Sequence, residues 1–141
     1  MRSRNCGRTV TELASTLTPS EIAGQAAHAI AVLNELTHGG GELSNAGDVR
    51  AIVRSLELIG QSLPQLYEQL ARFLVVQHED GQLMHEEGLE TDDSVTEVIE
   101  ALAAAGQAAD MMTAALTEAR AASQVLTPAK HRGWEGRLDA N

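Results

Sequence analysis

The stretch VRAIVRSLELIGQSLPQLYEQLARFLVVQ, residues Val49–Gln77, decides the fold of this chain. Large apolar side chains recur in it at alternating spacings of three and four residues, a period that suits a helix and not a strand. The seam positions are Val49, Ile52, Leu56, Ile59, Leu63, Leu66, Leu70, Phe73 and Gln77. All of them except Gln77 are large and apolar, so the stretch predicts a long helix that needs partners along one side.

The composition favours closely packed helices over a sheet. The chain has 141 residues, of which 43% are hydrophobic but only 2% are aromatic. Leu, Ile, Val, Met and Ala must therefore supply the core, whereas sheets depend on aromatic and β-branched residues. We predict a single all-α domain, since this length suffices to bury a core without disulfides or metals.

A second helical pattern precedes the central stretch. Thr18, Pro19 and Glu21 match the N-cap, first and third positions of a helix, which predicts a helix over residues 19–37. The run Gly39–Gly41 should end it, because glycine readily adopts the left-handed conformation of helix ends. The residues expected to face inward are Ile22, Ala26, Ala29, Ile30, Leu33 and Leu36.

A third helical pattern follows in the last part of the chain. Its seam contains apolar and small residues, which would let a neighbouring backbone approach closely. The positions are Val95, Val98, Leu102, Ala105, Ala109, Met112, Leu116, Ala119, Ser123 and Leu126.

The three helical regions, 9–37, 45–78 and 92–126, have similar lengths and short connections, which favours antiparallel neighbours. We predict an antiparallel three-helix bundle with long helices, kinked or broken near Pro19 and Pro64. Proline removes a backbone hydrogen bond inside a helix. The central region is therefore either one kinked helix or two nearly collinear helices, and the period favours the kink.

Charge divides the chain into an acidic body and basic ends. The net charge is −10. We expect a flexible basic arm over 1–8, a helical bundle over 9–127 and a flexible tail over 128–141. An acidic body repels phosphate, so nucleic acid is expected to bind only through the ends. The candidate interaction residues there are Arg2, Arg4, Arg8, Lys130, Arg132, Trp134 and Arg137.

The connection between the second and third helices is rich in carboxylates and histidines. His78, Asp80, His85 and Glu86 are the candidate ligands for a weakly bound cation, because imidazole and carboxylate suit zinc, manganese or iron. Their spacing matches neither a calcium loop nor a helical histidine pair. A solvated acidic loop explains the same residues, so we predict no metal or other cofactor.

Signals for catalysis or membrane insertion are not found. No serine lies in a Gly-x-Ser-x-Gly turn, and Gly39–Gly41 lacks the lysine and the strand of a phosphate-binding loop. No segment reaches the roughly 18 continuous apolar residues of a membrane span. The single Cys6 cannot form an internal disulfide, which favours a reducing, cytoplasmic setting. We expect no catalytic residue and no membrane contact.

Three functional hypotheses follow. The first is a non-catalytic helical-bundle protein that acts through protein–protein contacts and self-associates, since the seams offer more apolar surface than one helix needs. The second is a nucleic-acid-associated regulatory or accessory protein that uses its basic ends. The third is a weak metal-binding protein that uses the acidic loop.

Overall fold

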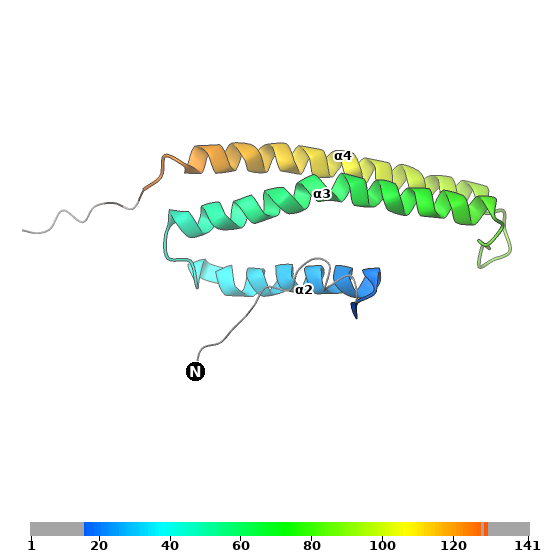
Figure 1. The fold of residues 1–141 in the computed structure, drawn as a ribbon, viewed down its shortest axis with the longest axis horizontal. Coiled ribbons are helices and arrows are strands. Elements are labelled where there is room, and N and C mark those ends of the chain that lie inside the picture. Colours follow the sequence, from blue (N-terminus) through cyan, green and yellow to red (C-terminus); the bar gives the residue numbers. More distant parts are fainter. Residues whose placement is uncertain (1–15, 128, 130–141) are drawn as a thin grey trace, which may run out of the picture. The chain divides into compact units, whose positions relative to one another are not determined.

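The structure is a computed structural model that describes residues 16–127 and 129 (Figure 1). Its elements are α2 (Pro19–Thr37), the short 3-10 helix η1 (His38–Gly40), α3 (Ala46–Glu79) and α4 (Asp92–Ser123). The described residues contain three long helices and no strand. The predicted all-α class is therefore confirmed.

The chain divides into two compact units, residues 1–43 and 44–141. The described part of the first unit contains α2 and η1, and that of the second contains α3 and α4. The predicted arm 1–8 lies outside the described residues, and so does the tail 128–141 apart from Ala129. Their predicted flexibility stays a prediction.

Helix α2 begins where its capping residues predict. The Glu21 amide donates to Thr18 Oγ1 at 3.3 Å, and the Thr18 amide donates to Glu21 Oε2 at 2.8 Å. These bonds satisfy amides that a helix start leaves unpaired, and Pro19 at the first position needs no partner. The bonds from Thr18 also lower the pKa of Glu21. The predicted break at Pro19 is thus a helix start.

Helix α2 ends at Thr37, just before the glycine run that was predicted to end it. Gly39 and Gly40 have φ angles of 63° and 82°, in the left-handed region that glycine adopts without strain. The helix itself buries none of its residues. Ile30 and Leu36, both expected to face inward, are 38% and 49% exposed. Isolated helices of this length are marginal in water, so α2 needs a partner surface.

Helix α3 is one continuous helix of 34 residues (Figure 1). Asn45 caps its start, because Asn45 Oδ1 accepts from the amides of Gly47 at 2.7 Å and Asp48 at 3.3 Å. The helix then runs through Pro64 to Glu79. Of the two predicted arrangements, the structure therefore contains the single helix.

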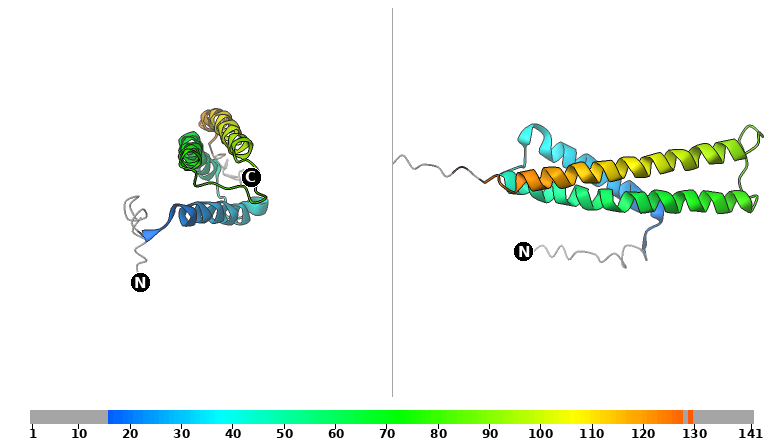
Figure 2. Two further views of the ribbon diagram at one scale, coloured as in Figure 1. Left: turned by 90° about the vertical axis from the view of Figure 1, so that its right-hand side faces the viewer. Right: turned by 90° about the horizontal axis from the view of Figure 1, so that it is seen from above.

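Helices α3 and α4 pack side by side and run antiparallel, as two views of the ribbon agree (Figures 1 and 2). The connection between them, residues 80–91, reverses the direction of the chain (Figure 1). Antiparallel neighbours were predicted from the matched lengths and short links, and this pair confirms the prediction.

Candidate functional site

The α3–α4 contact follows a heptad-like period in both helices. On the side of α3 that meets α4, none of the residues is fully exposed. These residues are Ala46, Arg50, Val53, Glu57, Gly60, Pro64, Tyr67, Ala71, Leu74 and His78. Their counterparts in α4 are Val95, Ile99, Leu102, Gly106, Ala109, Thr113, Leu116, Arg120 and Ser123.

The seam predicted for α3 lies beside the side that meets α4. Each predicted position directly precedes a contact residue, as Leu56 precedes Glu57 and Leu63 precedes Pro64. One residue corresponds to a rotation of about 100° around the helix. The largest apolar side chains of α3 therefore lie beside the contact with α4 rather than in it.

In α4 half of the predicted seam is confirmed. The confirmed positions, all of them half-buried or buried, are Val95, Leu102, Ala109, Leu116 and Ser123. The alternate positions are offset by one residue, as Val98 precedes Ile99 and Met112 precedes Thr113. The offset has the same sense as in α3.

Small residues explain why α3 and α4 meet on these sides and not along their most apolar seams. A Cβ atom on buried Gly60 would collide with Thr113 Oγ1 and would lie 3.0 Å from Met112 Cε. A Cβ atom on Gly106 would lie 3.8 Å from Pro64 Cα. The two backbones therefore approach each other closely at these glycines, and larger side chains in their place would force the helices apart.

An ion pair between a buried carboxylate and a half-buried arginine lies in the same contact. Glu57 has a side-chain exposure of 8% and accepts a 2.6 Å hydrogen bond on Oε2 from Arg120 Nε. Thr117 Oγ1 donates to Glu57 Oε1 at 2.7 Å. The hydrogen bond from Arg120, and then that from Thr117, lower the pKa of Glu57, while the same pairing raises the pKa of Arg120. The carboxylate is thus satisfied on both oxygens.

Sequence reasoning did not single out Glu57 or Arg120. A signal was present, because Glu57 is the one acidic residue of a three-four series in α3 that contains Gly60, and Arg120 is the one charged residue of a three-four series in α4 that contains Gly106. A buried pair of this kind needs excellent geometry to offset its desolvation, and it disfavours any register that separates the partners. The Glu57–Arg120 pair therefore acts as a contact that fixes the register of α3 against α4.

Arginines gather at the end of the pair where α3 begins and α4 ends. Arg50, Arg54 and Arg120 line one open groove there, with Glu57 between them. Arg50 Nη1 donates to the carbonyl oxygens of Ser123 at 3.3 Å and Gln124 at 3.4 Å. Cations at a helix C-terminus favour its dipole and satisfy its unpaired carbonyls. Arg50 thereby closes the end of α4.

The candidate cation ligands of the acidic loop do not converge. His78 Nε2 lies 2.8 Å from Asp92 Oδ1, and His78 Nδ1 lies 3.1 Å from Thr91 Oγ1. The Glu87 amide donates to His85 Nδ1 at 3.1 Å. Asp80 ends α3 through its own amide, which reaches the carbonyl of Val76 at 2.9 Å.

Among the residues that the structure describes, no three His, Cys, Asp or Glu side chains form a group able to hold a metal ion. His78 instead joins the end of α3 to the start of α4. Cation binding by His78, His85, Asp80 or Glu86 stays a prediction.

The most prominent feature of the described surface is an uncharged apolar side of the α3–α4 pair. The seam predicted for α3 and the offset half of the α4 seam lie on it together, because equal rotations in antiparallel helices point to the same side. We call this surface the open face. Its members are Val49, Ile52, Leu56, Ile59, Leu63, Leu66, Leu70, Phe73, Val98, Ala105, Met112 and Ala119.

Several large members of the open face are exposed. Leu66 and Leu70 are 45% and 46% exposed, Val98 is 44% exposed, and Phe73 reaches 62%. Exposed apolar side chains that gather on one side of a protein are typical of a binding surface. The open face is therefore the candidate functional site.

The candidate residues at the chain ends lie outside the described residues. They are Arg2, Arg4, Arg8, Lys130, Arg132, Trp134 and Arg137. Nucleic-acid binding through the ends stays a prediction.

No family model, curated protein or solved structure matches this chain. None of the described helices has both the length and the hydropathy to cross a bilayer.

Proposed function

We propose that this chain is a non-catalytic helical protein that acts through protein–protein contact and self-associates through the open face. The observation that carries the proposal is the large, uncharged apolar side of the α3–α4 pair, on which Phe73 is 62% exposed. Hydrophobic burial is the main favourable term in most protein association. A cytoplasmic location belongs to the same proposal and is supported by the single Cys6.

The residues against α4 argue for this assignment of roles. Glycines and the Glu57–Arg120 pair already complete that contact, so α3 and α4 do not need the leucines of the open face to hold each other. A seam of large residues with three-four spacing is the pattern with which helices recognise other helices. We therefore assign the open face to recognition and the α4 side of α3 to internal stability.

Light scattering after size exclusion, over a range of concentrations, tests the proposal. The wild-type chain is expected to have the mass of a dimer or larger assembly. Leu70→Glu should shift it to the monomer, because a carboxylate would be buried without a partner. Met111→Glu is the matched control, since Met111 is 74% exposed on α4 outside the open face. A wild-type chain that stays monomeric at all concentrations would contradict self-association.

A further inference from the structure

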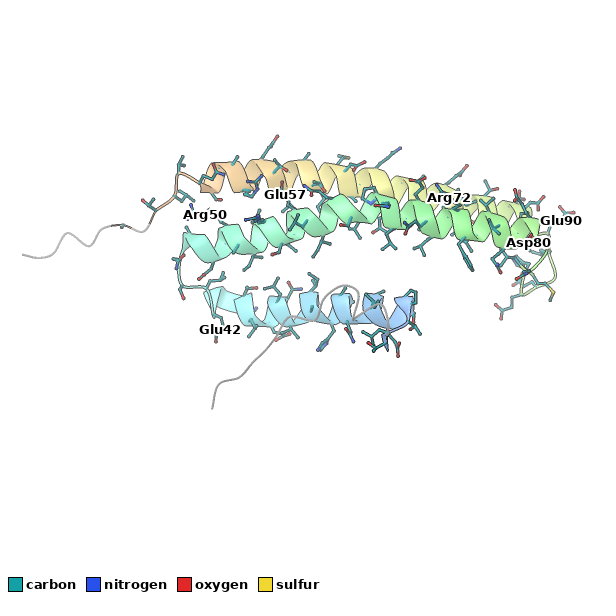
Figure 3. The ribbon with its side chains drawn as sticks, viewed as in Figure 1. Glu42, Arg50, Glu57, Arg72, Asp80 and Glu90 are labelled. Carbon is teal, nitrogen blue, oxygen red and sulfur yellow. The ribbon has the colours of Figure 1, made fainter. Side chains whose placement is uncertain are left out.

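The two halves of the α3–α4 pair differ strongly in charge. Residues 63–107, the half that includes the connecting loop, contain ten carboxylates and one arginine, a charge of −9. The other half, residues 44–62 and 108–127, contains four carboxylates and three arginines, a charge of −1. Figure 3 shows Asp80 and Glu90 at one end of the pair and Arg50 toward the other.

This asymmetry decides how a second copy can lie on the open face. A parallel arrangement would place the two strongly acidic halves side by side, where like charges repel over a Debye length of about 8 Å at physiological ionic strength. An antiparallel arrangement places each acidic half beside the nearly neutral half of the partner. The open face itself contains no charge, so it favours neither direction.

We infer that the open face binds a second copy of this chain in antiparallel orientation, around a two-fold axis that crosses α3. The inference rests on the self-association proposed above and adds its geometry. A two-fold arrangement closes, because the same surface serves both copies. Each arginine-containing end then lies beside an acidic loop of its partner.

The length of α3 supports a second copy as the occupant. Helix α3 has 34 residues. The open face runs along it from Val49 to Phe73, about 36 Å at 1.5 Å per residue. A second α3 has the required length and the complementary apolar surface.

Distances between spin labels on two copies test the orientation. Cys6→Ser provides a background without the native thiol. Ala51→Cys and Gln69→Cys then place one label each on exposed positions of α3 outside the open face, about 27 Å apart along the axis. Double electron–electron resonance is measured for each labelled variant alone and for an equilibrated mixture of the two.

Each labelled variant alone gives a same-site distance, between the same label on the two copies, and the mixture adds a mixed distance between the two different labels. In an antiparallel dimer, the mixed distance must be shorter than the longer of the two same-site distances, whatever the position of the axis. In a parallel dimer the two same-site distances are equal and the mixed distance exceeds both. The parallel result would overturn the orientation while leaving self-association intact. Loss of all inter-chain distances would overturn self-association itself, so the two failures are distinguishable.

Discussion

The two sides of α3 solve different packing problems. The side against α4 contains Gly60, Pro64 and the buried Glu57, and it holds its neighbour by close backbone approach and one ion pair. The open face contains leucines, isoleucines and Phe73, and no residue of α4 covers it fully. The comparison shows that the most hydrophobic side of a helix need not be the side that holds its nearest neighbour in the chain.

This division has a physical basis. Contact with α4 forms within one chain, so it tolerates a small apolar area if the geometry is specific. Contact with another molecule must offset the loss of translational and rotational freedom, and a large apolar area supplies the necessary free energy. The leucine-rich side is therefore suited to the intermolecular contact.

The largest expected effect comes from truncating the open face. Leu66→Ala combined with Phe73→Ala removes two large side chains from each copy, and full burial of each contributes about 2 kcal/mol. The dissociation constant of the dimer should rise at least about 1,000-fold. Light scattering or analytical ultracentrifugation measures the change, and circular dichroism should show an unchanged helix content.

Leu58→Ala combined with Val76→Ala is the matched control for that prediction. Both residues are exposed apolar residues of α3, at 56% and 46%, but neither belongs to the open face. The control pair should leave the dissociation constant within a few-fold of the wild type. Equal effects of the two pairs would mean that association depends on general hydrophobicity rather than on the open face.

The second prediction concerns the other side of α3. Glu57→Gln removes the charge that Arg120 and Thr117 satisfy, so it should lower the free energy of unfolding clearly at neutral pH. Because pairing lowers the pKa of Glu57, the ionised pair stabilises the fold above the unfolded-state pKa of about 4.3, and this contribution is lost as the pH falls through the folded-state pKa. The difference between wild type and variant should therefore shrink in acid.

Urea denaturation at neutral and acidic pH measures both effects. Glu68→Gln is the control, because Glu68 also forms an ion pair with an arginine, Arg72 of α3, at 2.6 Å. The side chains of Glu68 and Arg72, however, are 69% and 71% exposed. Exposed pairs contribute about 0.5 kcal/mol or less. Should Glu57→Gln cost no more than Glu68→Gln, the buried pair would not hold α3 against α4.

The sequence is enough to predict what depends on local residues. The capping residue Thr18 and the glycines after α2 fix where that helix begins and ends, and each acts within a few positions of itself. The contact register is different, because Glu57 meets Arg120 and Gly60 meets Thr113 across the fold. Counting large apolar residues finds the side of α3 with the greatest need for burial, which is not the side on which α4 lies.

The residues of the open face could therefore be predicted from the sequence, but the partner that binds them could not. The seam that begins at Val49 predicts a helix in need of partners, and α4 leaves much of that need unmet. The candidate ligands His78 and His85 were chosen for their chemistry alone. Their separate contacts, with Asp92 and with the Glu87 amide, depend on how the loop turns, which composition does not specify.

The smallest expected effect distinguishes two glycines of the α3–α4 contact. Replacing glycine by alanine inside a helix stabilises it by about 1 kcal/mol when the new methyl group has room. Gly106→Ala meets only ordinary contacts, with Pro64 Cα at 3.8 Å, so it should raise the free energy of unfolding. Gly60→Ala collides with Thr113 Oγ1, which is held by a 2.9 Å hydrogen bond to the Ala109 carbonyl, so it should lower that free energy by about 1–3 kcal/mol.

Urea denaturation of the two variants therefore compares the same chemical change at two points of one contact. Opposite signs are expected, because the helix propensity gained is equal and only the space differs. If both variants are stabilised, Thr113 moves aside at little cost, and the two helices are less closely fixed at Gly60 than the structure has them. The Glu57–Arg120 pair, one turn away, would then be the main contact that sets the register of α3 against α4, and the effect of Glu57→Gln should exceed that of either glycine variant.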